Sequence, residues 1–322
     1  MMNACAGLTR LPLILGAYLY LSAVASWGAP LSMATLAQLP AQASGMDWSG
    51  VALLSVNGVA NCSASAIAPN ALLTAAHCVA PSGAASVSQN VTAILRSVTE
   101  SVTVTASAVI PYPSYQASYL GGDLAVVILS QTLPSWVALY GIYDASNELG
   151  QVFDAAGFAG AALSGFHTYQ NRFENDGLFW TSDWLSFDYD SGVETNNALS
   201  AFGPSDLGVT NEGVIRFGDS GGPAFINGHV AGVPSGLWRY EYFANGQLTS
   251  ADVDNVINSS FGEIGFMVRV SLYRNWILST VAAGGNAGPS WLQNSSPVPE
   301  PGTLPLLAVA AIFWRMTAKR RR

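Results

Sequence analysis

Charge is scarce in this sequence, and lysine is almost absent. Charged residues make up 10% of the 322 residues, against about a quarter in an ordinary soluble domain. Between residues 26 and 299 there is no lysine, and 19 acidic residues face six arginines, which leaves a net charge of −13. A surface with so few cations repels nucleic acid phosphates and anionic lipid. Nucleic acid is therefore excluded as a partner of this region.

Long helical patterns are also missing. From about residue 45, short runs of β-type residues are broken by Gly, Asn, Pro and Ser, which is typical of strands joined by turns. Only residues 271–283, which end at Gly284, show apolar residues at helical spacing. The pattern predicts an all-β barrel or sandwich with one C-terminal helix. The expected strands cover residues 50–56, 71–74, 102–109, 124–129, 151–155, 224–233 and 265–270.

The N-terminus predicts export. Arg10 precedes the apolar run 11–24, which ends in the small-x-small site Ala23-Val24-Ala25. This order of features predicts a signal peptide over residues 1–25, removed by signal peptidase. An uncleaved membrane anchor is the alternative, although the run is short for the ~20 residues of a spanning helix. We expect the body of the chain to be exported in either case.

The C-terminus has a composition of its own. Residues 284–297 are rich in Gly, Ser, Asn and Pro, which predicts a flexible linker. Val298-Pro299-Glu300-Pro301 is then followed by an apolar stretch over 303–314 and a basic cluster. This segment, 298–322, resembles the PEP-CTERM sorting signal of bacterial envelope proteins. The resemblance implies processing by an exosortase, contact with the inner membrane that is at least transient, and a location in the envelope or outside the cell. A plain membrane anchor is the alternative.

Cysteine is rare, with three residues in the chain. Loss of the signal peptide removes Cys5 and leaves Cys62 and Cys78. An even pair in an exported chain predicts a disulfide, and closing this loop contributes about 3 kcal/mol in the chain-entropy model. Two buried free thiols are the alternative.

Three short segments carry the residue types of acyl-transfer chemistry. An apolar strand ends in Thr74-Ala75-Ala76-His77-Cys78, Gly122-Asp123 opens another, and Gly218-Asp219-Ser220-Gly221-Gly222-Pro223 forms a glycine-rich turn. A buried carboxylate needs a partner, and a histidine N–H is one. A serine hydroxyl becomes nucleophilic beside a base, while backbone N–H groups bind the oxyanion. Read singly, each segment also fits a structural histidine, a turn aspartate or an ordinary Gly-Ser turn.

In the order His, Asp, Ser, these segments resemble the chymotrypsin family of serine proteases over residues 45–283. The resemblance implies an all-β fold of two six-stranded antiparallel β-barrels packed face to face, with one C-terminal helix. The protease domain then covers residues 26–283, with the barrels meeting near residues 135–150. The supporting matches are the Cys62 and Cys78 pair, Gly157-Phe158, Ser235 and the closing stretch 269–277.

The resemblance also implies roles for individual residues. His77, Asp123 and Ser220 correspond to the catalytic triad, and the backbone N–H groups of Gly218 and Ser220 to the oxyanion hole. Ser235 corresponds to the serine that supports the buried aspartate and borders the specificity pocket. Val214, six residues before Ser220, corresponds to the base of that pocket, where a valine favours a neutral, apolar substrate side chain.

The expected reaction is hydrolysis of peptide bonds in a protein or peptide substrate, without a cofactor or a metal. Two alternatives stay open. One is an inactive homologue that serves as an envelope-anchored binding module, and the other is an esterase that uses the same site.

Two features depart from the family pattern. Many members carry Ile-Val-Gly-Gly at a new N-terminus, which pairs with the aspartate corresponding to Asp219. No such sequence precedes Gly50, so Asp219 needs another partner or has none.

The stretch 159–212 is aromatic and acidic, and its carboxylates, Asp183, Asp188 and Asp190 among them, suit Ca²⁺. A solvated surface loop is the favoured interpretation of that stretch. His167 and His229 lack ligand partners at metal spacing, and we expect both to be structural.

Overall fold

A computed structural model of the chain describes residues 45–88, 90–118, 121–178, 182–203, 205–244 and 247–284. The signal peptide expected at 1–25 and the sorting segment expected at 298–322 lie outside these ranges, as does the linker apart from Gly284. No helix within the described ranges is long and apolar enough to cross a membrane.

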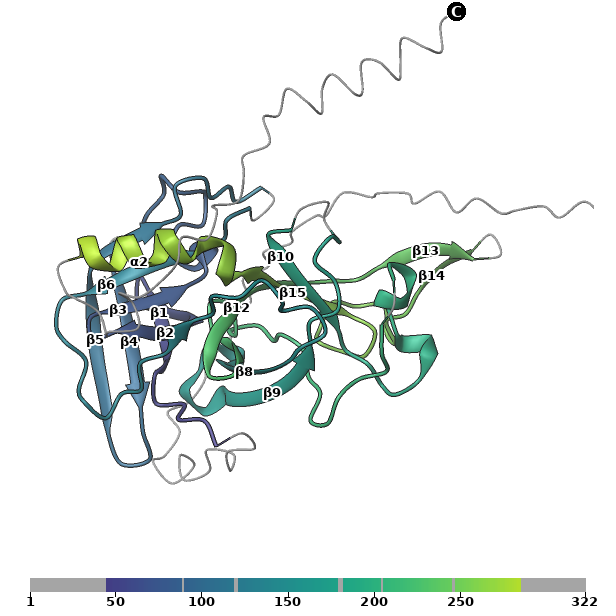
Figure 1. The fold of residues 1–322 in the computed structure, drawn as a ribbon, viewed down its shortest axis with the longest axis horizontal. Coiled ribbons are helices and arrows are strands. Elements are labelled where there is room, and N and C mark those ends of the chain that lie inside the picture. Colours follow the sequence, from purple (N-terminus) through teal and green to yellow (C-terminus); the bar gives the residue numbers. More distant parts are fainter. Residues whose placement is uncertain are drawn as a thin grey trace, which may run out of the picture.

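Six antiparallel strands form a closed barrel in the N-terminal half (Figure 1). Its five-residue strand β6 is buried along its whole length, because one face lies in the barrel and the other is covered by the C-terminal helix. An unbroken apolar run is what such a doubly covered strand requires. In barrel order, the strands are β1 (Val51–Val56), β2 (Val59–Ala68), β3 (Ala71–Thr74), β6 (Ala125–Leu129), β5 (Ser101–Pro111) and β4 (Val91–Arg96).

The C-terminal half is a second curved sheet of seven strands. Its outer strands β9 and β10 share no continuous ladder, and an antiparallel bridge between Asn175 and Ser186 lies just beyond β9. In sheet order, the strands are β10 (Trp184–Asp188), β15 (Ile264–Arg269), β12 (His229–Trp238), β11 (Ala224–Ile226), β8 (Val152–Phe158) and β9 (Phe166–Arg172), with the short β7 (Gly141–Ile142) alongside β12. The predicted all-β double-barrel fold is thus confirmed, except that the second barrel is a half-barrel sheet of seven strands where a barrel of six was expected.

One strand prediction was wrong. The run 224–233 is not a single strand, because the chain turns back between β11 and β12 at Asn227 and Gly228, whose φ angles are +50° and +79°. Positive φ at both central residues is the geometry of the hairpin turn that Asn-Gly favours. Because both strands are buried, the sequence shows one apolar run over 224–233, and the turn was not predicted.

The apolar core of the first barrel continues across the junction into the second barrel. Phe225 of β11 packs against Trp48, at a ring separation of 5.7 Å, and against Tyr140 at 4.7 Å. Burying an aromatic side chain of this size contributes about 1.5–3 kcal/mol. The junction is therefore a continuous core, and the site described below lies along it.

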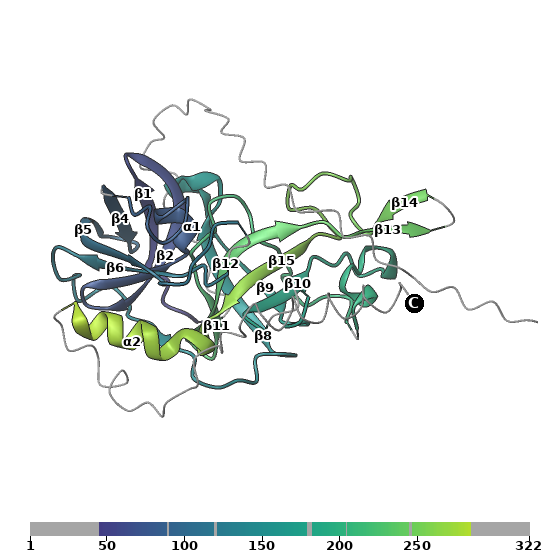
Figure 2. The ribbon, with the colours of Figure 1, turned by 90° about the horizontal axis from the view of Figure 1, so that it is seen from above.

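The C-terminal helix α2 (Arg274–Ala283) lies along the first barrel although it follows the second (Figures 1 and 2). Ile277 and Val281 of this helix are buried in the apolar core. The ring of Trp276 meets the ring of Tyr112 edge-on, at a centroid separation of 5.2 Å. The prediction of a helix over 271–283 is confirmed except for its first turn, which is the 3₁₀ segment η6 (Val270–Tyr273).

A buried ion pair anchors β15. Glu148 is fully buried, and its Oε2 accepts hydrogen bonds from Nε and Nη2 of Arg269, at 3.0 and 2.5 Å. Its Oε1 accepts a hydrogen bond from Ser271. Each oxygen of Glu148 therefore has a donor, as a buried carboxylate needs.

The remaining elements are short. The hairpin of β13 and β14 projects from the second barrel (Figure 1). These elements are β13 (Glu241–Ala244), β14 (Gln247–Ser250), α1 (Ala76–Val79), and the 3₁₀ turns η2 (Ala159–Ala161), η3 (Leu163–Gly165), η4 (Glu194–Asn196) and η5 (Leu199–Ala201).

Candidate active site

The ladder between β3 and β6 brings His77 and Asp123 together. Thr74 pairs with Ala125 at one end of this antiparallel ladder, so the chain after Thr74 and the chain before Ala125 leave the barrel at the same edge. Asp123 Oδ2 lies 2.7 Å from His77 Nδ1, and Asp123 Oδ1 accepts the backbone N–H of His77 at 2.7 Å. The aspartate is fully buried, whereas the imidazole is 27% exposed.

Ser235 of β12 completes the surroundings of this aspartate. Its hydroxyl donates a hydrogen bond of 2.6 Å to Asp123 Oδ2, the oxygen that also faces His77 Nδ1. The buried carboxylate thus receives three donors, one of them from the second barrel. A carboxylate in this position fixes the imidazole with Nδ1 protonated and Nε2 turned outward.

The predicted disulfide between Cys62 and Cys78 is present, and it ties β2 to the four-residue helix α1 that carries His77. Sulfur Sγ of Cys78 lies 3.7 Å from His77 Nε2. Because both sulfurs are used in the disulfide, this Cys-His-Cys group offers no thiolate to a metal.

Ser220 lies in a turn that is pressed against the first barrel. A side chain at Gly221, whose φ is +82°, would place its Cβ 2.1 Å from Thr74 Oγ1 and 2.4 Å from the carbonyl oxygen of Ser63. The turn is held from both sides, because the carbonyl of Ser220 accepts the N–H of Ser63 and the N–H of Gly221 donates to Pro234. Only glycine permits this approach.

The two N–H groups expected in the oxyanion hole are free within the described part of the chain. The backbone bonds of the turn use the N–H groups of Asp219, Gly221 and Gly222, and those of Gly218 and Ser220 donate to no acceptor there. The carbonyl of Gly218 accepts a hydrogen bond of 2.8 Å from Ser63 Oγ. This bond orients the peptide group that precedes Asp219.

His77 and Ser220 lie on either side of the disulfide without a hydrogen bond between their side chains. Cys78 Sγ is 3.7 Å from His77 Nε2 and 3.7 Å from the carbonyl oxygen of Ser220. Hydrogen bonds between a nucleophile and its base are often long in ligand-free enzymes and tighten when substrate binds. The structure therefore brings His77, Asp123 and Ser235 into contact and leaves Ser220 beside them.

Asp219 has a partner that sequence reasoning did not identify. Its Oδ2 lies 3.2 Å from Nε2 of His167 on β9 and accepts the N–H of Arg216 at 2.8 Å. A Cβ at Gly157 would lie 2.4 Å from Asp219 Oδ1, so this glycine leaves room for the carboxylate. The feature of the sequence that could have pointed to His167 is the scarcity of histidine, since it is one of three in the chain.

A cavity of about 580 Å³ opens beside Ser220. Apolar side chains line much of it, and Phe217 at its mouth is 76% exposed. Val214 is not among the lining residues: it is buried in the core of the second barrel together with Ile215, which also borders the cavity. The lining residues are Ala159, Gly160, Ile215, Arg216, Phe217, Ser220, Gly236, Leu237, Ile257, Asn258 and Ser259.

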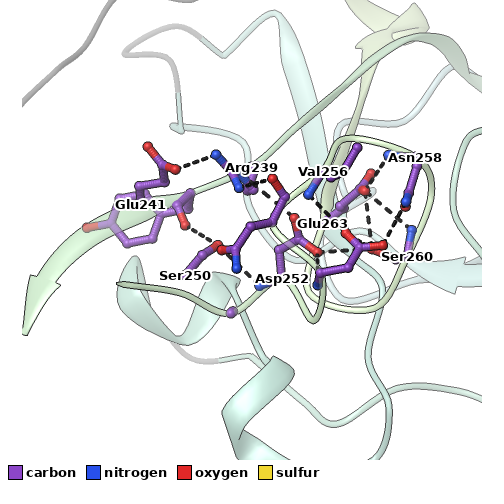
Figure 3. Close-up of polar contacts among 12 residues, drawn as sticks. Arg239, Glu241, Ser250, Asp252, Val256, Asn258, Ser260 and Glu263 are labelled. Carbon is purple, nitrogen blue, oxygen red and sulfur yellow. Dashed lines mark hydrogen bonds and ion pairs between the residues drawn. The ribbon is translucent and has the colours of Figure 1, made fainter. Parts of the chain in front are cut away.

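The wall formed by residues 257–259 is held by a buried glutamate. Glu263 accepts the backbone N–H groups of Asn258, Ser259 and Ser260 (Figure 3). Burial raises its pKa, although these N–H groups act in the opposite direction. Ser259 Oγ also donates to the carbonyl of Ile215 at 2.8 Å, so two walls of the cavity are joined. Sequence reasoning missed this loop.

The environment of His77 predicts the acid limb of any activity that uses it as a base. Burial lowers the pKa of His77, but the charge of Asp123 and its hydrogen bond raise it by more, so the net shift is upward from 6.5. Only the neutral imidazole accepts a proton, so log kcat/KM should rise with unit slope as the pH increases, with its midpoint above 6.5. NMR titration of the imidazole gives the same pKa directly, and it should fall in Asp123→Asn. A wild-type midpoint below 6.5 would contradict this account.

Two barrels that enclose a buried aspartate behind a histidine at their junction define a trypsin-like protease fold. The model of the trypsin family matches residues 39–277. The chain belongs to this family. It is also 28% identical over 267 residues to an uncharacterized peptidase of Corynebacterium glutamicum strain R and to a protein described as a peptidase from strain ATCC 13032. Each match covers 80% of this chain and 78% of the relative.

Proposed function

We propose that the protein is a serine endopeptidase that hydrolyses peptide bonds through an acyl-enzyme intermediate. The observation that carries the proposal is the three-way contact at Asp123, whose carboxylate binds both the ring and the backbone of His77 and receives Ser235. An aspartate so placed orients the imidazole and stabilises its charged form. An inactive homologue has no need of this arrangement.

The steps follow from the positions of the groups. Ser220 Oγ attacks the scissile carbonyl carbon while His77 Nε2 takes the hydroxyl proton, and the N–H groups of Gly218 and Ser220 bind the oxyanion. His77 then gives the proton to the departing amine, and the C–N bond breaks to leave an ester on Ser220. Water, deprotonated by His77, hydrolyses this ester and restores the serine. Binding of substrate would bring Ser220 Oγ within reach of His77.

The cavity beside Ser220 predicts a preference for apolar over basic side chains before the cleaved bond. No carboxylate lines it among the described residues, and Arg216 is the charged lining side chain. Placing a substrate cation near this guanidinium costs several kcal/mol, so kcat/KM for leucine should exceed that for lysine by about 100-fold or more. Matched peptides that differ in this one residue measure the ratio. Arg216→Ala should improve cleavage after lysine, whereas equal rates in the wild type would refute the assignment.

A fluorophosphonate probe tests the proposed nucleophile. The purified chain should form a covalent adduct at Ser220, and Ser220→Ala should form none, while a casein digest in parallel reports proteolysis. Wild-type labelling no greater than that of the variant would favour the inactive binding module. Labelling with cleavage of small esters but not of casein would favour the esterase.

A further inference from the structure

Three carboxylates converge at the end of the second sheet, away from the cavity beside Ser220. Glu174 follows β9, Asp188 is the last residue of β10, and Asp190 lies two residues further on. One oxygen from each lies within 4.8 Å of the other two. Asp188 is 0% exposed and Asp190 is 5% exposed. These are not side chains of a solvated loop, so the interpretation favoured from the sequence is wrong here.

The surrounding backbone holds this cluster through some of its oxygens and leaves others free. Glu174 Oε1 accepts the N–H of Asp206 at 2.9 Å, and Asp188 Oδ2 accepts the N–H of Leu199 at 2.7 Å. Within the described part of the chain, Glu174 Oε2, Asp188 Oδ1 and Asp190 Oδ1 are buried and have no hydrogen-bond partner. Buried acceptors without donors, on three carboxyl groups that lie so close together, are costly unless something positive lies between them.

Among the described residues, no arginine or histidine forms an ion pair with Glu174, Asp188 or Asp190. Arg172 is directed to Asp206, with its Nε 2.5 Å from Oδ2 of that residue. A cation bound between the three carboxyl groups would compensate for the burial of their oxygens.

We propose that Glu174, Asp188 and Asp190 bind a calcium ion. All three donors are hard oxygens, which suit Ca²⁺ and not the softer metals that select nitrogen or sulfur. Ca²⁺–O bonds of about 2.3–2.6 Å place two ligands at most about 5 Å apart, and one oxygen from each of the three carboxyl groups lies within 4.8 Å of the other two. Mg²⁺ keeps most of its water and favours one or two carboxylates, so it fits three buried ones less well.

The ion would fix the segment that leads to the cavity wall. The N–H of Asp190 donates to Glu212 at 2.6 Å, and the other oxygen of Glu212 accepts the N–H of Val209. Gly213 and Val214 follow, and then Ile215 and Arg216 line the cavity. Calcium bound at Asp190 would thus stabilise residues 189–212 and, through Glu212, the cavity lining at Ile215 and Arg216. This inference does not depend on the proposed proteolytic activity.

The experiment uses the full chain, freed of divalent ions with EGTA and exchanged into metal-free buffer. Calorimetric titration should find one Ca²⁺ ion per chain. At a hundred times the measured Kd, the melting temperature should rise by about 5–10 °C for a domain of this size, and equimolar Mg²⁺ should produce a much smaller rise. Absence of both a binding heat and a melting shift in 10 mM CaCl₂ would overturn the proposal.

Variants distinguish this site from the other acidic loop. Asp188→Asn with Asp190→Asn should abolish the calcium response and should melt no lower than the wild type in EGTA, because it removes repulsion between buried charges. Should that protein fail to fold, Glu174→Gln, which alters a half-buried residue, should weaken calcium binding at least tenfold. The matched control is Asp252→Asn with Asp254→Asn, in the loop of Figure 3, and should respond as the wild type does. Loss of the response in this control alone would place the ion elsewhere and refute the proposal.

Discussion

Replacement of His77 by alanine is expected to lower kcat/KM by about 10⁴-fold or more. Asp123 contacts both the ring Nδ1 and the backbone N–H of His77, which orients the imidazole for its proposed role as the base that takes the proton of Ser220. Because the two residues act as a unit, Ser220→Ala combined with His77→Ala should be no worse than either change alone. Initial rates on the best peptide substrate, with active-site titration of the wild type, provide the measurement.

A histidine outside this site serves as the control for that experiment. His229 is exposed, and its Nδ1 lies 3.0 Å from the carbonyl oxygen of Asn227 in the adjoining turn. His229→Ala should retain kcat/KM within about twofold. An equal loss in both variants would show that the effect came from damage to the fold. Full activity in His77→Ala would remove the proposed general base.

Removal of Arg269 should produce the largest loss of stability. Among the described residues, Arg269→Met leaves the fully buried Glu148 with Ser271 as its one side-chain donor, and an unpaired buried charge costs about 3–5 kcal/mol. The free energy of unfolding in urea should fall by that amount. Adding Glu148→Gln should restore part of the loss, because the orphaned charge is then removed.

An exposed ion pair provides the comparison. Arg172 and Asp206 are 35% and 41% exposed, so Arg172→Met should cost less than about 1 kcal/mol. If the two arginine variants unfold at the same urea concentration, the buried pair contributes no more than a surface pair. The buried pair of Glu148 and Arg269 would then not anchor β15.

The sequence predicted best what is encoded locally. Glycines around Ser220 and an apolar strand after Asp123 carry their own chemical signals, and the resemblance placed them in a double-barrel fold that the structure confirms. Two histidines were predicted to be structural for want of metal-ligand spacing, yet His167 lies beside Asp219. That contact depends on the pairing of β8 with β9, which no local pattern specifies.

Features that depend on how distant segments pack together could not be predicted from the sequence. The acidic stretch was visible as composition, but burial of Asp188 and its approach to Glu174 follow from where β9 and β10 end. The expected pocket base at Val214 illustrates the same difficulty on a smaller scale. Val214 and Ile215 are buried in the same core cluster, and only the packing of this segment determines that Ile215 also borders the cavity.

Because Asp219 is paired with His167, the geometry of the site does not depend on the position of the N-terminus. In relatives that use a freed amino group, the contact forms only after a cut at one particular bond. His167 belongs to the same sheet as the strands around Asp219, and it takes its place when β9 pairs with β8. Neither residue of this contact comes from the N-terminal segment, so trimming before Trp48, which packs against Phe225, would remove neither of them. Maturation at a ragged or variable N-terminus is therefore compatible with a fully assembled turn at Ser220.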